Sequence, residues 1–351
     1  MLEILRFQFT ILVCFAFIIA GSCRPTDTTL TYTGNTMGTT YNVVAIAPPD
    51  TPSKNLGEAI EATLERVNAH LSNWDPKSEI SRFNALQSTD PARVSNMMVE
   101  VLSAANAVNQ DSDGHFDVTL APVIELWGFG ERKPEDPLPH NSALAVARTK
   151  VGQSTKLSLD AASETLTKID PDVTINLSAI AKGFGVDEVA ATLRKFSIEN
   201  YMVEIGGDLV TRGIKANGEN WRIGIEKPNP RDRSIQLILD LSGYGMATSG
   251  DYRNYREHDG KRYSHIIDVK TGRPITHQTA SVTVLAESAM LADAWATALL
   301  AVGRERGMRM AKERDIAAFF IYRASDVATD GDKIRFSTLM SPRFEAITVG
   351  N

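Results

Sequence analysis

Hydrophobic and polar positions along the chain predict a mixture of strands and helices. Alternating or β-branched runs, typical of strands, occur at 40–47, 201–205, 221–225, 235–241, 280–285 and 317–322. Helical spacing of apolar residues occurs at 57–70, 94–109, 141–151, 179–196 and 289–302. Because the two kinds of element are interspersed without a strict βαβα order, the pattern favours an α+β fold with a mixed, largely antiparallel sheet and packed helices.

The first residues have the pattern of an export signal. An apolar run at 11–20 follows Arg6, and it is too short for a transmembrane helix, which needs about 20 apolar residues. Small residues then lead into Cys23, in an arrangement that resembles the lipobox of bacterial lipoproteins. We therefore expect a lipoprotein signal peptide at 1–22, a lipidated Cys23 with a polar tether at 23–30, and a folded domain at 31–351. The alternative is an ordinary cleaved signal beside an incidental cysteine.

The two cysteines fit a lipid-anchored protein. Cys14 lies in the segment that would be removed, and Cys23 would carry the lipid, so no thiol would remain for a disulfide. An exported domain of this size can be stable without one. The lipid would hold the domain on a bacterial membrane, facing the periplasm.

Composition excludes some classes of protein. The 351 residues are 43% hydrophobic with a net charge of -6, which is too apolar and too weakly charged for a disordered chain. No run of Lys and Arg is longer than two residues, so we expect no nucleic-acid partner. The Pro- and charge-rich stretch at 131–140 reads as an exposed loop that could separate two lobes.

The segment 289–302 is the most informative about chemistry. Asp293 and Thr297 interrupt an otherwise apolar helix, and their spacing of four places them on one face. A buried carboxylate needs a cation, a hydrogen-bonding partner or a shifted pKa. A carboxylate beside a hydroxyl suits Mg²⁺. The alternative is a structural Asp bonded to backbone donors near the helix start.

The helix at 179–196 presents a lysine where cations are disfavoured. Ser178 can cap this helix, and Lys182 falls in its first turn. A lysine beside free backbone N–H groups and Gly183 indicates an anion site, most simply for a phosphate. The alternative is a solvated surface lysine.

The stretch 246–277 is dense in hydroxyl, charged and aromatic side chains. His265 and Asp268 lie three residues apart on a short extended segment or turn. A histidine near a carboxylate can act as a general base. His265 is therefore a candidate base, and the alternative is an incidental histidine on a turn.

Aromatic residues also occur beside Gly, Pro and Asp rather than in regular apolar periods. Trp74, Trp127 and Phe129 have such positions. They could form a wall for a flat ring, or pack against the core.

Together these segments resemble the FAD:protein FMN transferase family, also called ApbE. The resemblance extends from about residue 37 to 303. It rests on the blocks MGTTY (37–41), NWDPKSEISRFN (73–84), FDVTLAPVIELWGFG (116–130), LSAIAKGFGVD (177–187), VEIGGD (203–208), TSGDYRNY (248–255), YSHIIDVKTGRPI (263–275) and ADAWATAL (292–299).

The resemblance implies a bilobed, T-fold-like α+β architecture and a Mg²⁺-dependent enzyme. Its activity would be transfer of FMN from FAD to a Thr hydroxyl of an acceptor flavoprotein, with release of AMP. By resemblance, Mg²⁺ would bind Asp293, Thr297 and the carbonyl of Ala179. His265 would be the base, and its orientation by Asp268 is our own inference. The FAD contacts would be Met37, Trp74, Trp127, Gly128, Phe129, Asn176, Lys182 and Ile267.

Two positions depart from the usual pattern of the family. Asn176 stands where the family usually has Asp, and Trp74 where Tyr is frequent. These two substitutions affect the binding of the ligand, and with it the balance between FMN transfer to a protein and hydrolysis of FAD by water. Two other functions therefore stay open: a Mg²⁺-dependent FAD pyrophosphatase, and a flavin-binding lipoprotein without catalysis.

Overall fold

A single antiparallel sheet forms the larger lobe of the protein. The computed structural model describes residues 27–130, 136–229, 234–324 and 335–349. The sheet has the strand order β1-β2-β6-β7-β10-β15-β16-β17, and every neighbouring pair is antiparallel. Its strands are β1 (Thr28–Thr36), β2 (Thr39–Ala47), β6 (Asn200–Ile205), β7 (Asp208–Arg212), β10 (Gly245–Gly250), β15 (Thr279–Ala286), β16 (Ala317–Arg323) and β17 (Phe336–Met340).

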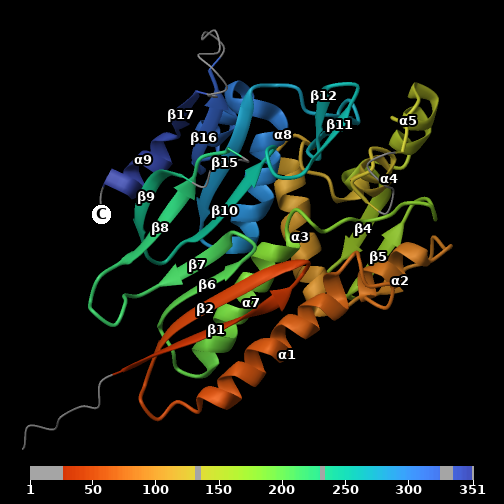
Figure 1. Ribbon diagram of the computed structural model, residues 1–351. Coiled ribbons are helices and arrows are strands. Elements are labelled where there is room, and N and C mark those ends of the chain that lie inside the picture. Colours follow the sequence, from red (N-terminus) through yellow and green to blue (C-terminus); the bar gives the residue numbers. More distant parts are fainter. Residues whose placement is uncertain (1–26, 131–135, 230–233, 325–334, 350–351) are drawn as a thin grey trace, which may run out of the picture.

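Both faces of this sheet are covered. One face carries three helices, α1 (Ser53–Leu71), α7 (Ala181–Lys195) and α8 (Ala289–Glu313) (Figure 1). The other face carries the hairpin of β8 (Trp221–Glu226) and β9 (Ile235–Leu241), together with α9 (Pro342–Val349). Burial on both sides explains why seven successive residues of β15 are buried, whereas β6, with one half-buried face, alternates.

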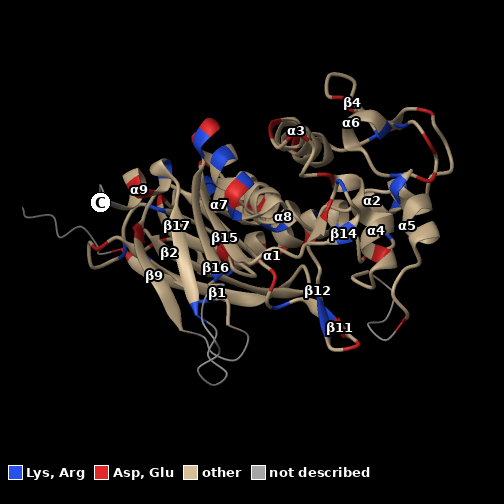
Figure 2. Ribbon diagram, turned by 90° about the horizontal axis from the view of Figure 1, so that it is seen from above, with Lys and Arg blue, Asp and Glu red and all other residues tan. Residues whose placement is uncertain are grey.

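A smaller lobe is inserted between α1 and α7. Figure 2 shows it beside the sheet, with acidic and basic residues interspersed over both lobes. A core shared by α1, α3, α7 and α8 joins the lobes. The inserted elements are α2 (Glu79–Ala85), β3 (Ala92–Arg93), α3 (Asn96–Asp111), the 3-10 helix η1 (Val118–Leu120), α4 (Ala121–Leu126), α5 (Asn141–Arg148), α6 (Gln153–Lys156), β4 (Leu157–Asp160) and β5 (Thr165–Lys168).

Two short hairpins complete the described chain. The first pairs β11 (Tyr255–His258) with β12 (Lys261–Ser264), and the second pairs β13 (Ile267–Asp268) with β14 (Arg273–Pro274). None of the helices in the described residues is long and apolar enough to cross a bilayer. The segment expected to be a signal peptide and the lipidated Cys23 lie outside the described residues.

The predicted α+β class is confirmed, and the six predicted strands and five predicted helices are all present. Three details differ. β1 begins at Thr28, inside the expected tether, because its residues pair along the whole of β2. Ser178 does not cap α7, whose N-cap residue is Ile180 without a side-chain hydrogen bond. The stretch 131–140, of which 131–135 are not described, does not separate the lobes, because α4 and α5 on either side of it share one apolar cluster.

Close contact between the starts of α7 and α8 holds the two helices that carry the polar site. At Gly183, an added Cβ would lie 2.2 Å from the backbone oxygen of Ala289. Ser288 caps α8 through the amide of Leu291, and Asp187 of α7 accepts hydrogen bonds from the amides of Ala289 and Met290.

Replacing Gly183 by Ala is expected to destabilise the protein. Helix propensity alone would favour Ala by about 1 kcal/mol. The clash with the α8 backbone reverses that sign, since overpacking of this kind costs about 1–3 kcal/mol. Urea unfolding of the two proteins measures the difference, and a more stable Gly183→Ala variant would contradict this contact.

Candidate active site

A cavity with a volume of about 1170 Å³ lies where the two lobes meet. Side chains from the β1–β2 turn, the end of α1, the segment before α4, the start of α7, β10, the segment after β12 and α8 line it. Pockets for drug-sized ligands have volumes of about 300–1,000 Å³. The cavity is therefore large enough for a ligand of dinucleotide size.

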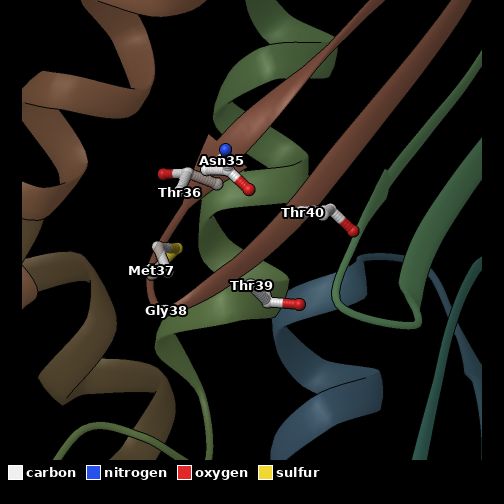
Figure 3. Close-up of a pocket in the computed structure, with 6 residues that line it drawn as sticks. All are labelled: Asn35, Thr36, Met37, Gly38, Thr39 and Thr40. Atoms are coloured by element: carbon white, nitrogen blue, oxygen red, sulfur yellow. The ribbon is translucent and has the colours of Figure 1, made fainter.

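The tip of the β1–β2 hairpin forms one rim of this cavity. Met37 and Gly38 make the turn, both with positive φ (51° and 73°), and Figure 3 shows them at the tip of the hairpin, with α7 behind. A hollow of about 500 Å³ is lined by residues 35–40 of this turn. Met37 also lines the large cavity, and its sulfur lies beside Gly185, where an added Cβ would be 3.2 Å away.

A lysine between two carboxylates lies at the start of α7. The Nζ of Lys182 donates to Asp208 in a short hydrogen bond, and it lies 3.3 Å from the Oδ2 of Asp293. The side chains of Asp208 and Asp293 are 4% and 5% exposed, whereas that of Lys182 is 30% exposed and lines the cavity. The Gly183 amide, in the first turn of α7, also donates to Asp293 Oδ2 at 3.3 Å.

The pKa values of this cluster follow from burial and charge. Burial lowers the pKa of the Lys182 ammonium, but the carboxylates of Asp208 and Asp293 more than offset this and hold it above the usual range. Burial and then the charge of Asp293 raise the pKa of Asp208, against the opposing effect of Lys182.

The donor atoms fit a hard cation such as Mg²⁺. Asp293 and Thr297 both lie on α8 and line the cavity, as does Ala179. The Thr297 hydroxyl lies 3.0 Å from that of Ser249. Within the described residues no three His, Cys, Asp or Glu side chains gather at one point. A cation here would use carboxylate, hydroxyl and carbonyl oxygens, which are the hard donors that Mg²⁺ prefers.

His265 faces the cavity in a defined tautomer. Its Nδ1 lies 2.8 Å from the carbonyl oxygen of Asn254, and because a carbonyl can only accept, Nδ1 carries the hydrogen. Nε2 is then the basic nitrogen. Burial lowers the pKa of His265 and the charge of Lys182 lowers it further, against the Asn254 hydrogen bond and Asp251. The ring is therefore largely neutral at pH 7.

The orientation of His265 by Asp268 is a prediction that the structure contradicts. The Asp268 carboxylate accepts from the amide of Lys270 at 2.8 Å, and Asp268 does not line the cavity. The Asn254 carbonyl orients the His265 ring in place of Asp268. Phe129 contacts the His265 ring edge to face, with 6.2 Å between centroids.

The aromatic residues divide into two groups. Trp74 is 67% exposed, and both Trp74 and Phe129 line the cavity, as a ring-binding wall requires. The Trp127 side chain instead stacks on Tyr263 and donates to the Gly272 carbonyl at 2.8 Å. Trp127 is buried in the core. Gly128 makes a turn with φ 79°. Neither residue lines the cavity.

Most of the other predicted residues come together. Asn176 lines the cavity, and its Oδ1 accepts from the Ser178 amide at 2.9 Å. Ile267 lines it as well. In all, the cavity brings together Met37, Trp74, Phe129, Asn176, Ala179, Lys182, His265, Ile267, Asp293 and Thr297.

Sequence reasoning missed several residues of the site. His115, Phe116 and Asp117 line the cavity, and no hydrogen-bond partner for either ring nitrogen of the buried His115 is found among the described residues. Their position directly before a helix start was the available signal. Asp208, at the end of VEIGGD, was also missed.

A mixed α+β fold with a large cavity that brings together the Lys182 cluster and His265 is typical of an enzyme that acts on an anionic substrate. Comparison with known proteins narrows this class. The ApbE family profile matches residues 37–320. The chain belongs to the ApbE family.

Relatives and solved structures cover nearly the whole chain. A protein of Vibrio cholerae named FAD:protein FMN transferase is 44% identical over 310 residues, 88% of this chain and 92% of the relative. One of the same name from Haemophilus influenzae is 41% identical over 312 residues, 87% and 90% of the two chains. The structure of flavin transferase ApbE from Vibrio cholerae matches with a TM-score of 0.82 at 41% identity, covering 92% of this chain and 99% of that one. The apo form of Pseudomonas stutzeri flavinyl transferase ApbE also gives 0.82, at 37% identity, covering 92% and 97%.

Proposed function

We propose that the protein transfers FMN from FAD to a Thr hydroxyl of an acceptor flavoprotein, with help from Mg²⁺ and release of AMP. The enzyme is a FAD:protein FMN transferase, the name shared by its relatives. Beyond that name, we propose that Mg²⁺ is the metal, that a Thr hydroxyl is the acceptor and that AMP is the leaving group. The observation that supports it best is that one cavity holds both His265 and the polar cluster around Lys182.

Asp293, Thr297 and the Ala179 carbonyl would hold Mg²⁺. Bound there, the cation would neutralise charge on the diphosphate and on the departing phosphate. Lys182 would add a second positive charge at the same wall of the cavity. Trp74 and Phe129 would contact ring systems of FAD through their faces.

His265 would act as the general base. Its Nε2 takes the proton of the acceptor hydroxyl as that oxygen attacks the phosphorus on the FMN side. The new P–O bond joins FMN to the acceptor, the bond to the bridging oxygen breaks, and its electron pair leaves with AMP. The proton then passes from His265 to the AMP phosphate or to water. The AMP that leaves therefore consists of the adenosine phosphate half of FAD with the bridging oxygen, and it or water carries the proton that the acceptor hydroxyl lost.

The test is incubation of the protein with FAD, Mg²⁺ and an acceptor flavoprotein, followed by a denaturing gel. Covalent flavin fluorescence on the acceptor band is expected. Steady formation of FMN and AMP without a fluorescent band would instead identify a FAD pyrophosphatase. Intact FAD after long incubation would identify a flavin-binding protein without catalysis.

The pH dependence of transfer should reflect the lowered pKa of His265. Only the neutral ring accepts a proton, so the rate falls as pH drops through this pKa. Because burial places it below the ordinary value of 6.5, the fall in kcat/KM for the acceptor should have its midpoint below pH 6.5. Stopped samples analysed by gel fluorescence across this range provide the profile. A midpoint above pH 6.5 would argue against His265 as the base.

We also propose that lipid on Cys23 anchors the enzyme to a bacterial membrane, with the domain in the periplasm. The support is the small-residue sequence that leads into Cys23. Mass spectrometry of the N-terminal peptide from the native membrane fraction tests this, and an unmodified Cys23 would contradict it.

A further inference from the structure

The ammonium of Lys182 already occupies the position of a cation beside Asp293. Its Nζ lies 3.3 Å from Asp293 Oδ2 and closer still to Asp208. Lys182 is the second residue of α7, where the helix dipole disfavours positive charge. The two nearly buried carboxylates are what offset this cost.

A metal ion and this ammonium compete for one carboxylate. Asp293 supplies the carboxylate of the expected cation site, and its Oδ2 is in contact with Lys182 and the Gly183 amide, both positive or partly positive. Two like charges only a few ångströms apart in a protected site repel strongly. Even a cation bound to the other oxygen of Asp293 would lie within a few ångströms of Nζ, so its repulsion weakens the contact of Lys182 with Asp293.

Asp208 determines where Lys182 goes. It lies at the start of β7, directly after the Gly206–Gly207 turn that also lines the cavity. Its short hydrogen bond to Nζ does not involve Asp293. Lys182 can thus leave Asp293 and stay bound at the cavity wall.

We propose that Lys182 is a resident counter-cation that neutralises Asp293 until a metal ion displaces it, and that Asp208 is the positioning residue that then holds the ammonium toward the diphosphate. The inference rests on the proposed function, since the cation and the diphosphate belong to that function. It adds that the metal ion binds before Lys182 turns toward the diphosphate. Metal binding releases Lys182 from Asp293, so the two positive charges on the substrate are assembled together.

The test is Mn²⁺ binding to the ligand-free protein, followed by the EPR signal of the free ion. Asp208→Asn leaves Lys182 with Asp293 as its only carboxylate partner in the cluster, so Mn²⁺ should bind about 10–100-fold more weakly than to the wild type. Lys182→Met in the Asp208→Asn background removes the competitor. It should then restore Mn²⁺ affinity by about tenfold or more.

Lys195→Met is the matched control, because it removes the same charge from the exposed last turn of α7. It should leave Mn²⁺ affinity unchanged. Both test variants keep at most one unpaired carboxylate in the cluster, and thermal melting confirms that they fold. Equal Mn²⁺ affinity in Asp208→Asn and in the double variant that also carries Lys182→Met would overturn the inference and leave the proposed function standing. Absence of Mn²⁺ binding to every variant would overturn the cation site and the inference with it, whereas the acceptor assay tests transfer independently.

Discussion

Replacing His265 by Ala should lower the rate of FMN transfer by about 10²–10⁴-fold, the usual contribution of a general base. The variant loses the one imidazole whose Nε2 is left basic by the Asn254 hydrogen bond. FAD binding should be nearly unchanged, because the cluster around Lys182 and the exposed Trp74 remain. Single-turnover transfer measures the first quantity, and quenching of FAD fluorescence the second.

His140→Ala serves as the matched control, since His140 is exposed and precedes α5, away from the cavity lining. It should transfer FMN at the wild-type rate. Asp268→Asn should also behave like the wild type, because Asp268 contacts the Lys270 amide instead of His265. A fall in rate for Asp268→Asn as large as that for His265→Ala would restore the role first expected for Asp268.

Replacing Asp293 by Ala should lower transfer by about a hundredfold or more, because a bound cation contributes several kcal/mol to the stabilisation of developing charge. Added Mg²⁺ should no longer increase the rate. The free energy of unfolding should fall by about 1–3 kcal/mol, since hydrogen bonds to a buried carboxylate are lost. Lys182 keeps Asp208 as a partner, so the protein should still fold.

Mg²⁺ titrations of the transfer rate and urea unfolding measure these two effects. Asp240→Asn is the control, because Asp240 is half exposed on β9, outside the cavity lining. An Asp293→Ala variant that still responds to Mg²⁺ as the wild type does would place the metal elsewhere.

The elements that carry the site could largely be predicted from local pattern. The first part of α8, residues 289–302, is apolar apart from Asp293 and Thr297, so Asp293 was expected to be buried, and it is. Lys182 in the first turn of α7 was equally visible, since helix starts repel cations. In both cases the helical pattern of a single element was sufficient to predict the position of the side chain.

The partners of these residues could not be predicted, because they come from distant parts of the chain. Asp208 is a single acid after two glycines, and its importance depends on the pairing of β6 with β7 beside α7. The group that orients His265 is a backbone carbonyl, which no side-chain pattern reveals. Trp127 looked like part of a ring wall because it lies beside glycine, outside a regular apolar period, but Tyr263 from a remote hairpin stacks on it.

The inserted lobe was also beyond local pattern. The charge-rich stretch at 131–140 resembled a boundary, because loops between lobes and loops within one have the same composition. Only the shared cluster of α4 and α5 shows that both sides of the stretch belong to one lobe.

The central claim is most directly tested by the ratio of covalent flavin to AMP in a single reaction with FAD, Mg²⁺ and an acceptor flavoprotein. Mass spectrometry of the acceptor identifies the modified residue, and chromatography quantifies AMP. Transfer to a hydroxyl predicts one AMP for each FMN attached, with the added mass on a Thr. AMP accompanied by free FMN and an unmodified acceptor would contradict the account.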